Sequence, residues 1–231
     1  MYVKKREISP IYFGFLSIFA IINTIMLVRF LMSIPLYKIL VQETLWSFFL
    51  STIYITSIFI SDANLFLFKS TSLEKFNSFI RNYYSVIVYP YNYNITLEYW
   101  LILVVGFILG NNPFYEKGKV TTIIILESLY LHLAIFIILI IDLLCTKRKM
   151  SNNKTLSLII NFIFFWYCVA VLSSNYIFFM PAYPFMKDAG ILLMVIIFII
   201  SLALINLCHY LHIFLVRKIN RDYEISIKKI E

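Results

Sequence analysis

The sequence is poor in charged residues and in the small residues that build polar loops. Only 14% of its 231 residues are Asp, Glu, Lys or Arg, and it holds five glycines and six prolines. A soluble domain has a charged fraction nearer about 25%, so this composition argues against a fully water-exposed surface. The glycines form neither G-x-G-x-x-G nor a P-loop, and there is no G-x-S-x-G elbow. Phosphate-binding loops and the usual serine-hydrolase motif are therefore excluded.

Cysteine and histidine are also scarce. The three cysteines lie in or beside apolar runs without paired or metal-type spacing, which predicts no disulfide framework: Cys145, Cys168 and Cys208. Three histidines are too few for a membrane di-metal oxygenase. His209 and His212 share a helix face, but we expect them near the cytosolic interface and away from His132. We therefore predict no metal and no other cofactor.

Long apolar stretches are what the sequence has in abundance. Hydrophobic residues make up 61% of the chain, in runs close to the roughly 20 residues that cross a bilayer. This predicts an all-α, polytopic membrane helical bundle with about six transmembrane helices, in a single domain over residues 1–231. The first run continues without a small-residue cleavage site, which predicts a retained helix rather than a signal peptide. The expected spans are 11–31, 41–61, 84–109, 122–144, 156–179 and 190–216.

The net charge of +8 has a membrane explanation. Basic residues lie between and beyond the apolar runs and are not interleaved with aromatic residues, so we expect membrane lipids and no nucleic acid as partners. If both termini are cytosolic, 15 of the 20 Lys and Arg residues fall on the inner side, including Arg81 and Arg148. We predict a multi-pass protein of the endoplasmic reticulum or plasma membrane with cytosolic termini. The oligomeric state stays open.

The third expected span contains Pro90, which removes one helix hydrogen bond, followed by Asn92, Asn94 and Thr96. Groups freed inside a bilayer must find partners within the bundle. Two interpretations fit this pattern. Either the helix is kinked and satisfies its own polar groups, or a polar cavity lies beside it.

Polar side chains at membrane depth are costly and usually face the bundle interior or a cavity. His132 is the most conspicuous, because "ESLYLHLAIFIILIID" at 127–142 is otherwise almost wholly apolar. On physical grounds alone, the ring is equally well explained as a structural hydrogen-bond partner. The other residues of this kind are Asn23, Thr44, Glu98, Asn161, Asn175 and Asn206.

Several of these residues fall in a recognisable order. Thr44 enters an apolar helix that ends at Asp62, "YP" at 89–90 precedes Trp100, an apolar run leads from His132 to Asp142, and "AYPF" stands at 182–185. This order resembles the androgen-induced-gene family of multi-pass membrane proteins, also called FAR-17a-like. The chain departs from the family at Leu129 and Asn175, where the family has histidines.

The resemblance implies an activity. Characterised members of the family hydrolyse fatty acid esters of hydroxy fatty acids with a Thr nucleophile and a His. Carried over, Thr44 would attack the ester and His132 would act as base, because a Thr hydroxyl needs an adjacent base and an imidazole in apolar surroundings resists charging. Asp62 lies 18 residues from Thr44, about 27 Å along a helix, and cannot orient the pair. Ser128 and Asn175 are the candidates for that supporting role.

An alternative from another class is a non-catalytic bundle that binds or transports lipid or acts as a scaffold. The two interpretations differ in one testable respect: only the hydrolase requires both Thr44 and His132 for ester cleavage.

Two glycosylation sequons test the predicted topology. "NIT" at Asn94 falls inside the membrane and "NKT" at Asn153 on the cytosolic side, so neither should carry sugar. Expression in eukaryotic cells followed by glycosidase digestion should leave the electrophoretic mobility unchanged. A mobility shift that disappears in Asn153→Gln would place that loop on the luminal side and contradict the topology.

Overall fold

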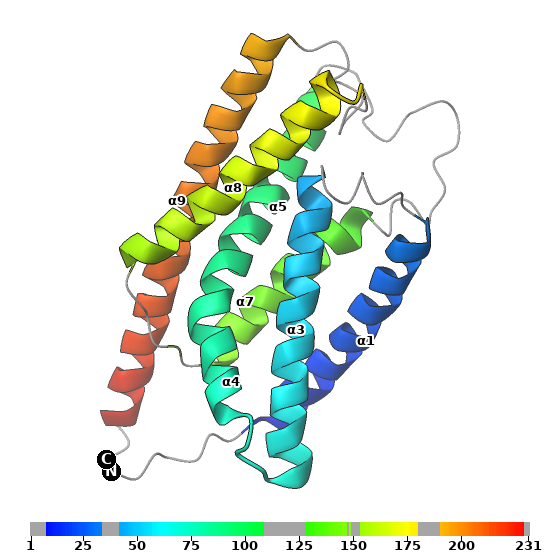
Figure 1. The fold of residues 1–231 in the computed structure, drawn as a ribbon. Coiled ribbons are helices and arrows are strands. Elements are labelled where there is room, and N and C mark those ends of the chain that lie inside the picture. The colour runs from blue at the N-terminus through cyan, green and yellow to red at the C-terminus, as the bar shows by residue number, and fades with distance from the viewer. Residues whose placement is uncertain are drawn as a thin grey trace.

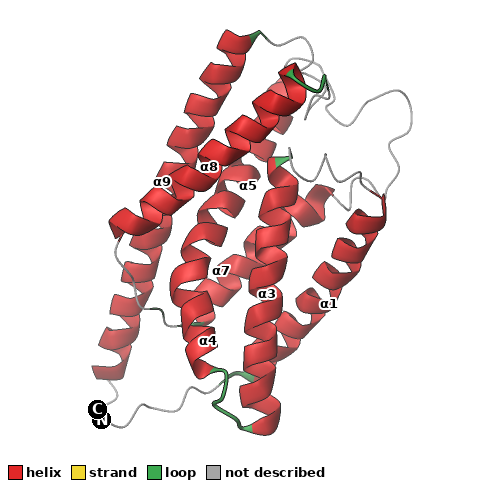
Figure 2. Cartoon of the chain, viewed as in Figure 1, coloured by secondary structure: helices red, strands yellow, loops and turns green. Residues whose placement is uncertain are grey.

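The computed structural model describes residues 8–33, 42–108, 128–146, 148, 153–179 and 190–228. These residues form helices and short connections and contain no strand (Figure 2). The prediction of an all-α bundle is thereby confirmed.

The described residues form six helical units, counting each continuous run as one, in line with the predicted number of about six. They are α1 (Pro10–Ser33), α3 (Glu43–Phe68), the continuous run α4 (Glu74–Phe79), η1 (Ile80–Tyr84) and α5 (Ser85–Ile108), the run η2 (Tyr130–Ala134) and α7 (Ile135–Cys145), α8 (Asn153–Tyr176), and α9 (Ile191–Lys228). η1 and η2 are π-helical turns, in which the backbone is wound more widely than in an α-helix. α1 begins and α9 ends at the same end of the bundle (Figure 1).

Four of the described helices are long and apolar enough to cross a membrane, namely α1, α3, α8 and α9. The η2–α7 run is a shorter apolar helix. Large apolar side chains cover the outer faces, as shown by Ile11 on α1, Phe162 on α8 and Leu192 on α9, each more than half exposed. Such faces suit contact with lipid acyl chains, so the protein is a helical membrane protein.

Three helices extend well beyond the expected spans. The second span was expected to end at 61, whereas α3 continues to Phe68. The third is joined to α4 and η1, so its helix begins ten residues before the expected start at 84. The sixth was expected to end at 216, whereas α9 continues to Lys228. The last two extensions are more polar than the spans themselves, and hydropathy marks the apolar part of a helix, not its ends.

α5 is the central helix. It packs against α3, α7, α8, α9 and η2, whereas α1 packs against α3 and α7 on one side of the bundle (Figure 1). α5 continues through Pro90, and the Asn92 side chain just beyond the proline is bonded by its neighbours. The Asn92 amide donates to Ser51 Oγ at 2.7 Å and to the Val88 carbonyl at 2.8 Å. Tyr93 differs, because its buried hydroxyl has no hydrogen-bond partner among the described residues. The first interpretation of this span, a helix that satisfies its own polar groups, therefore holds for Asn92 and not for Tyr93.

A buried group of four charged residues joins the helices, and we call Asp62, Arg81, Asp142 and Arg148 the ionic cluster. Asp142, on α7, is bonded by both guanidinium groups, with Arg148 Nη2 at 2.5 Å from its Oδ2. Arg81, on η1, also reaches Asp62 of α3 at 2.7 Å. All four side chains are at least 96% buried. The two positive and two negative charges balance.

Neutral side chains also donate hydrogen bonds to the Asp142 carboxylate. The hydroxyls of Tyr12, Tyr54 and Tyr89 donate to its carboxylate at 2.5, 2.5 and 3.0 Å. These tyrosines lie on α1, α3 and α5. One carboxylate on α7 therefore ties together four helices, which places α7 and η2 relative to α5.

Arg148 reaches this cluster from beyond the end of α7. Its carbonyl accepts a hydrogen bond from the Asn220 amide of α9 at 2.7 Å, which fixes the backbone there. Burial alone lowers the pKa of Arg148, but Tyr54, Tyr89 and Asp142 raise it overall, so the guanidinium stays charged. The sequence interpretation placed Arg81 and Arg148 in basic loops, and the structure shows both as buried ion-pair partners.

Removing the charge at Asp142 should destabilise the bundle strongly. Asp142→Asn leaves two buried guanidinium groups without their shared partner, and breaking a buried pair in this way costs about 3–5 kcal/mol. Unfolding in detergent should show this loss, and the double variant Asp142→Asn with Arg148→Met should recover part of it. The matched control is Glu74→Gln, an exposed acid on α4, which should change stability by less than about 0.5 kcal/mol. Equal stability of Asp142→Asn and the parent would contradict the account.

Candidate functional site

His132 is the third residue of η2 and its side chain is mostly buried. Its ring stacks on Tyr99 of α5, with centroids 3.9 Å apart and planes 5° from parallel. The Thr96 hydroxyl, one turn earlier on α5, donates to the His132 carbonyl at 2.8 Å. α5 thus holds both the backbone and the ring of His132.

The imidazole keeps one nitrogen available. Nδ1 of His132 is buried and has no hydrogen-bond partner among the described residues. A buried polar atom without a partner is costly, about 1–3 kcal/mol, and each such atom in a folded protein calls for an explanation. Because stacking fixes the ring and Nδ1 is not engaged by another described residue, the imidazole can accept a proton from a bound molecule.

Ser128 belongs to the same group of residues. Its hydroxyl donates to Tyr99 Oη at 3.0 Å, and it lies one turn before His132. Ser128 therefore bonds the hydroxyl of Tyr99, and His132 stacks on the face of the same ring. The sequence singled out Ser128 but missed Tyr99, because this tyrosine is one of 17 and no spacing marks it.

Thr44 is the second residue of α3 and is partly buried. It shares a face with Phe48, one turn on, whose ring packs edge-to-face on Phe30 of α1 at 5.2 Å. η2 reaches the same side, because Tyr130 donates to Asn23 of α1 at 2.6 Å and η2 packs against α3. Thr44 and His132 thus lie on contacting elements, α3 and η2. No hydrogen bond joins the two residues in the described part of the chain.

Asn175 is buried near the end of α8, a helix whose main packing partners are α5 and α9. Asp62 lies in the ionic cluster, bonded to Arg81 and Asn77 at the opposite end of α3 from Thr44. The expectation that Asp62 does not orient the Thr44–His132 pair agrees with this position.

A second polar group lies beside Thr44 in the chain. The Asn94 amide donates to Glu43 Oε1 and Glu98 Oε1, each at 3.1 Å, and the Ser201 hydroxyl donates to Glu98 at 2.8 Å. These contacts join the first turn of α3 to α5 and α9. Asn94 and Thr96 point to opposite sides of α5, so this helix separates the two glutamates from His132.

The two remaining histidines face the interior of the bundle. His209 and His212 are fully buried, and the His212 ring packs on Tyr89 and Tyr93 of α5 at 4.6 and 6.3 Å. His212 therefore lies between α9 and α5. Among the described residues, no group of three or more His, Cys, Asp or Glu side chains could hold a metal ion.

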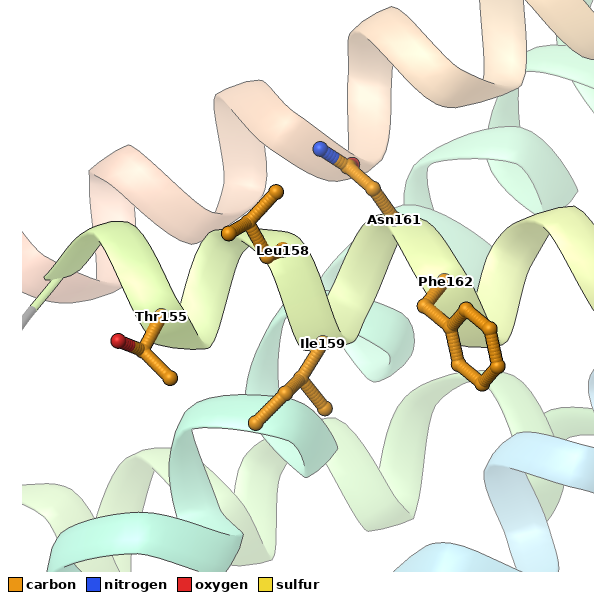
Figure 3. Close-up of a pocket in the computed structure, with 5 residues that line it drawn as sticks. All are labelled: Thr155, Leu158, Ile159, Asn161 and Phe162. Atoms are coloured by element: carbon orange, nitrogen blue, oxygen red, sulfur yellow. The ribbon is translucent and has the colours of Figure 1, made fainter.

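The surface of α8 carries a depression that is separate from these residues. Its lining comes from α8 alone, and Asn161 points toward α9 (Figure 3). There the Asn206 amide of α9 donates to Asn161 Oδ1 at 2.9 Å. A hollow formed by one helix, with Leu158 and Phe162 mostly exposed, brings no reactive groups together. Its lining residues are Thr155, Leu158, Ile159, Asn161 and Phe162.

The helices and their apolar outer faces define a polytopic helical membrane protein. The family model for FAR-17a/AIG1-like proteins matches residues 14–218. The chain belongs to this family, as the resemblance in the sequence implied. Comparison with curated proteins gave no match, and none of the solved structures matches the chain.

The stacking of Tyr99 on His132 predicts how accessible the imidazole is to reagents. In Tyr99→Ala the ring loses its cover, so diethyl pyrocarbonate should modify His132 several-fold faster, as followed by peptide mass spectrometry. Tyr99→Phe keeps the stacked ring and should react like the parent. His212, which is fully buried, is the internal control. Equal rates in Tyr99→Ala and Tyr99→Phe would contradict the stacked arrangement.

Proposed function

We propose that this protein is an integral membrane hydrolase of lipid esters, with Thr44 as nucleophile and His132 as base. The observation that carries the proposal is the His132 ring, which is fixed against Tyr99 and whose buried Nδ1 has no hydrogen-bond partner among the described residues. Membership of the FAR-17a/AIG1-like family adds support.

The chemistry assigns one role to each residue. Thr44 Oγ attacks the ester carbonyl and passes its proton to His132, and His132 then protonates the departing alkoxide. Water next attacks the Thr44 acyl ester, releases the carboxylic acid and restores the hydroxyl. His132 acts as base and acid in turn, which requires a ring held at a fixed place. Stacking on Tyr99 and the Thr96 contact serve that purpose.

The hydroxyl and the imidazole must come within about 2.6–3.2 Å for proton transfer. Such contacts are often long in the absence of substrate and shorten only when substrate binds. Thr44 is in the first turn of α3, where a change of side-chain rotamer needs no movement of the helix.

The substrate class follows from the surroundings of the site. Both residues lie inside a bundle with apolar outer faces, so an ester with long acyl chains reaches them from the bilayer. Fatty acid esters of hydroxy fatty acids, the substrates implied by the family resemblance, have a central ester between two such chains.

Fluorophosphonate labelling of the detergent-solubilised protein tests the proposal. Thr44→Ala should abolish labelling, and His132→Ala should slow it about 10²–10⁴-fold, the usual contribution of a general base. Thr44→Ser, which keeps a hydroxyl, should be labelled. Thr52→Ala is the matched control on α3, because the Thr52 hydroxyl bonds its own helix at Phe48 O.

Labelling that persists in Thr44→Ala would show that another residue is the nucleophile. A folded parent that takes no label and cleaves no ester would favour the non-catalytic, lipid-binding bundle.

A further inference from the structure

Three buried side chains around Tyr89 carry polar atoms that have no hydrogen-bond partner among the described residues. Within that part of the chain, Arg148 leaves Nε and Nη1 unbonded, His212 leaves both ring nitrogens unbonded, and Tyr93 leaves its hydroxyl unbonded. Each of the three residues is at least 96% buried. They come from three places in the chain: α9, α5 and the segment after α7.

The three groups converge on one aromatic ring. The Arg148 guanidinium carbon lies 4.6 Å from the centre of the Tyr89 ring, and the His212 ring centre is also 4.6 Å away. Tyr93, one turn further along α5, lies 5.9 Å from Tyr89 and 6.3 Å from His212, measured between ring centres.

A ligand must satisfy these atoms, since each costs about 1–3 kcal/mol when left buried and unbonded. Arg148 and Tyr93 supply donors, and a neutral His212 supplies one donor and one acceptor. An anion would add a buried negative charge, and the ionic cluster beside it is already balanced. Water fits, because it is neutral, accepts and donates, and typically makes about three such bonds when buried.

The same side of α5 leads to His132. Tyr93 is one turn before Thr96, whose hydroxyl bonds the His132 carbonyl. On the facing run, the Tyr93 ring packs on Phe136 at 5.4 Å, and Phe136 is one turn after His132. Tyr93 and His132 are therefore about one helical turn apart, roughly 5 Å along both helices. Nδ1 of His132, also buried and unbonded, is the next open polar atom on this side.

We propose that buried water molecules occupy the space between Arg148, His212 and Tyr93 and continue to His132. Resting on the hydrolase function proposed above, this water is the reactant that releases the acyl group. A water molecule loses a proton to His132 and attacks the Thr44 acyl ester, its oxygen passes to the carboxylic acid, and the proton returns to Thr44 Oγ. The bilayer around the bundle offers no water for this step, so an internal supply explains why polar groups line α5.

Radiolytic footprinting tests the water directly, because hydroxyl radicals formed from a bound water oxidise the side chain beside it. Tyr93 should be oxidised several-fold faster than Tyr91. Both tyrosines are almost fully buried, at 3% and 0% exposure, but the Tyr91 hydroxyl is bonded to the Ile160 carbonyl at 3.3 Å. Equal, slow oxidation of the two residues would overturn the proposal whatever the protein catalyses.

The role of the water is tested by Tyr93→Phe, with Tyr91→Phe as matched control. Loss of one hydrogen bond to the water should slow acyl release about tenfold, so an acyl adduct on Thr44 should accumulate and be seen by intact mass spectrometry. Tyr91→Phe should show no adduct.

Fast oxidation of Tyr93 in the parent without an adduct in Tyr93→Phe would overturn the role of this water in hydrolysis. If fluorophosphonate labels neither the parent nor any variant, the hydrolase proposal fails. Footprinting still decides whether water is bound.

Discussion

The structure depends on neutralising the negative charge of Asp142, whose carboxylate is buried inside an apolar bundle. Arg81 and Arg148 bond it from η1 and from the segment after α7, and Asp62 balances the second positive charge. Uncompensated, any of these charges would cost several kcal/mol. Because Asp62 and Arg81 are far from Asp142 in sequence, satisfying the charges fixes where α3, α7 and the helix that contains η1 and α5 lie. Apolar packing in a bilayer is not selective in this way, since lipid tails are as apolar as the helices.

α5 extends this ordering to the candidate site. From the ionic cluster toward Tyr99 it presents a polar group at nearly every turn facing η2 and α7, namely Tyr89, Tyr93, Thr96 and Tyr99. Thr96 and Tyr99 hold His132 by its backbone and its ring. The opposite side of α5 carries Asn94 and Glu98, which hold the first turn of α3 and part of α9. Thr44 is placed by that first turn, so α5 positions both the proposed nucleophile and the proposed base.

Hydropathy was sufficient to predict the helices, because runs such as "FLSIFAIINTIMLV" have no other stable place than a lipid-facing helix. It failed for Arg81 and Arg148, which looked like loop charges. A residue near the end of a span can fold back into the bundle, and neither composition nor spacing reports that. His132 and Ser128 were conspicuous as isolated polar residues, and the structure places both against Tyr99. Tyr99 itself was missed because its role depends on stacking against a ring from another helix, which leaves no local signature in the sequence.

The central claim is that the packing around α5 brings Thr44 and His132 to one site. Cross-linking tests it most directly, with Thr44→Cys and His132→Cys in a background where Cys145, Cys168 and Cys208 are replaced by Ala. A short bifunctional maleimide should join this pair within the folded protein, as it should join Asn23→Cys to Tyr130→Cys, whose native side chains are hydrogen-bonded. Thr44→Cys with Ser72→Cys, at the far end of α3, should stay unlinked. If the Asn23–Tyr130 pair is joined and the Thr44–His132 pair is not, the two residues do not form one site and the account is wrong.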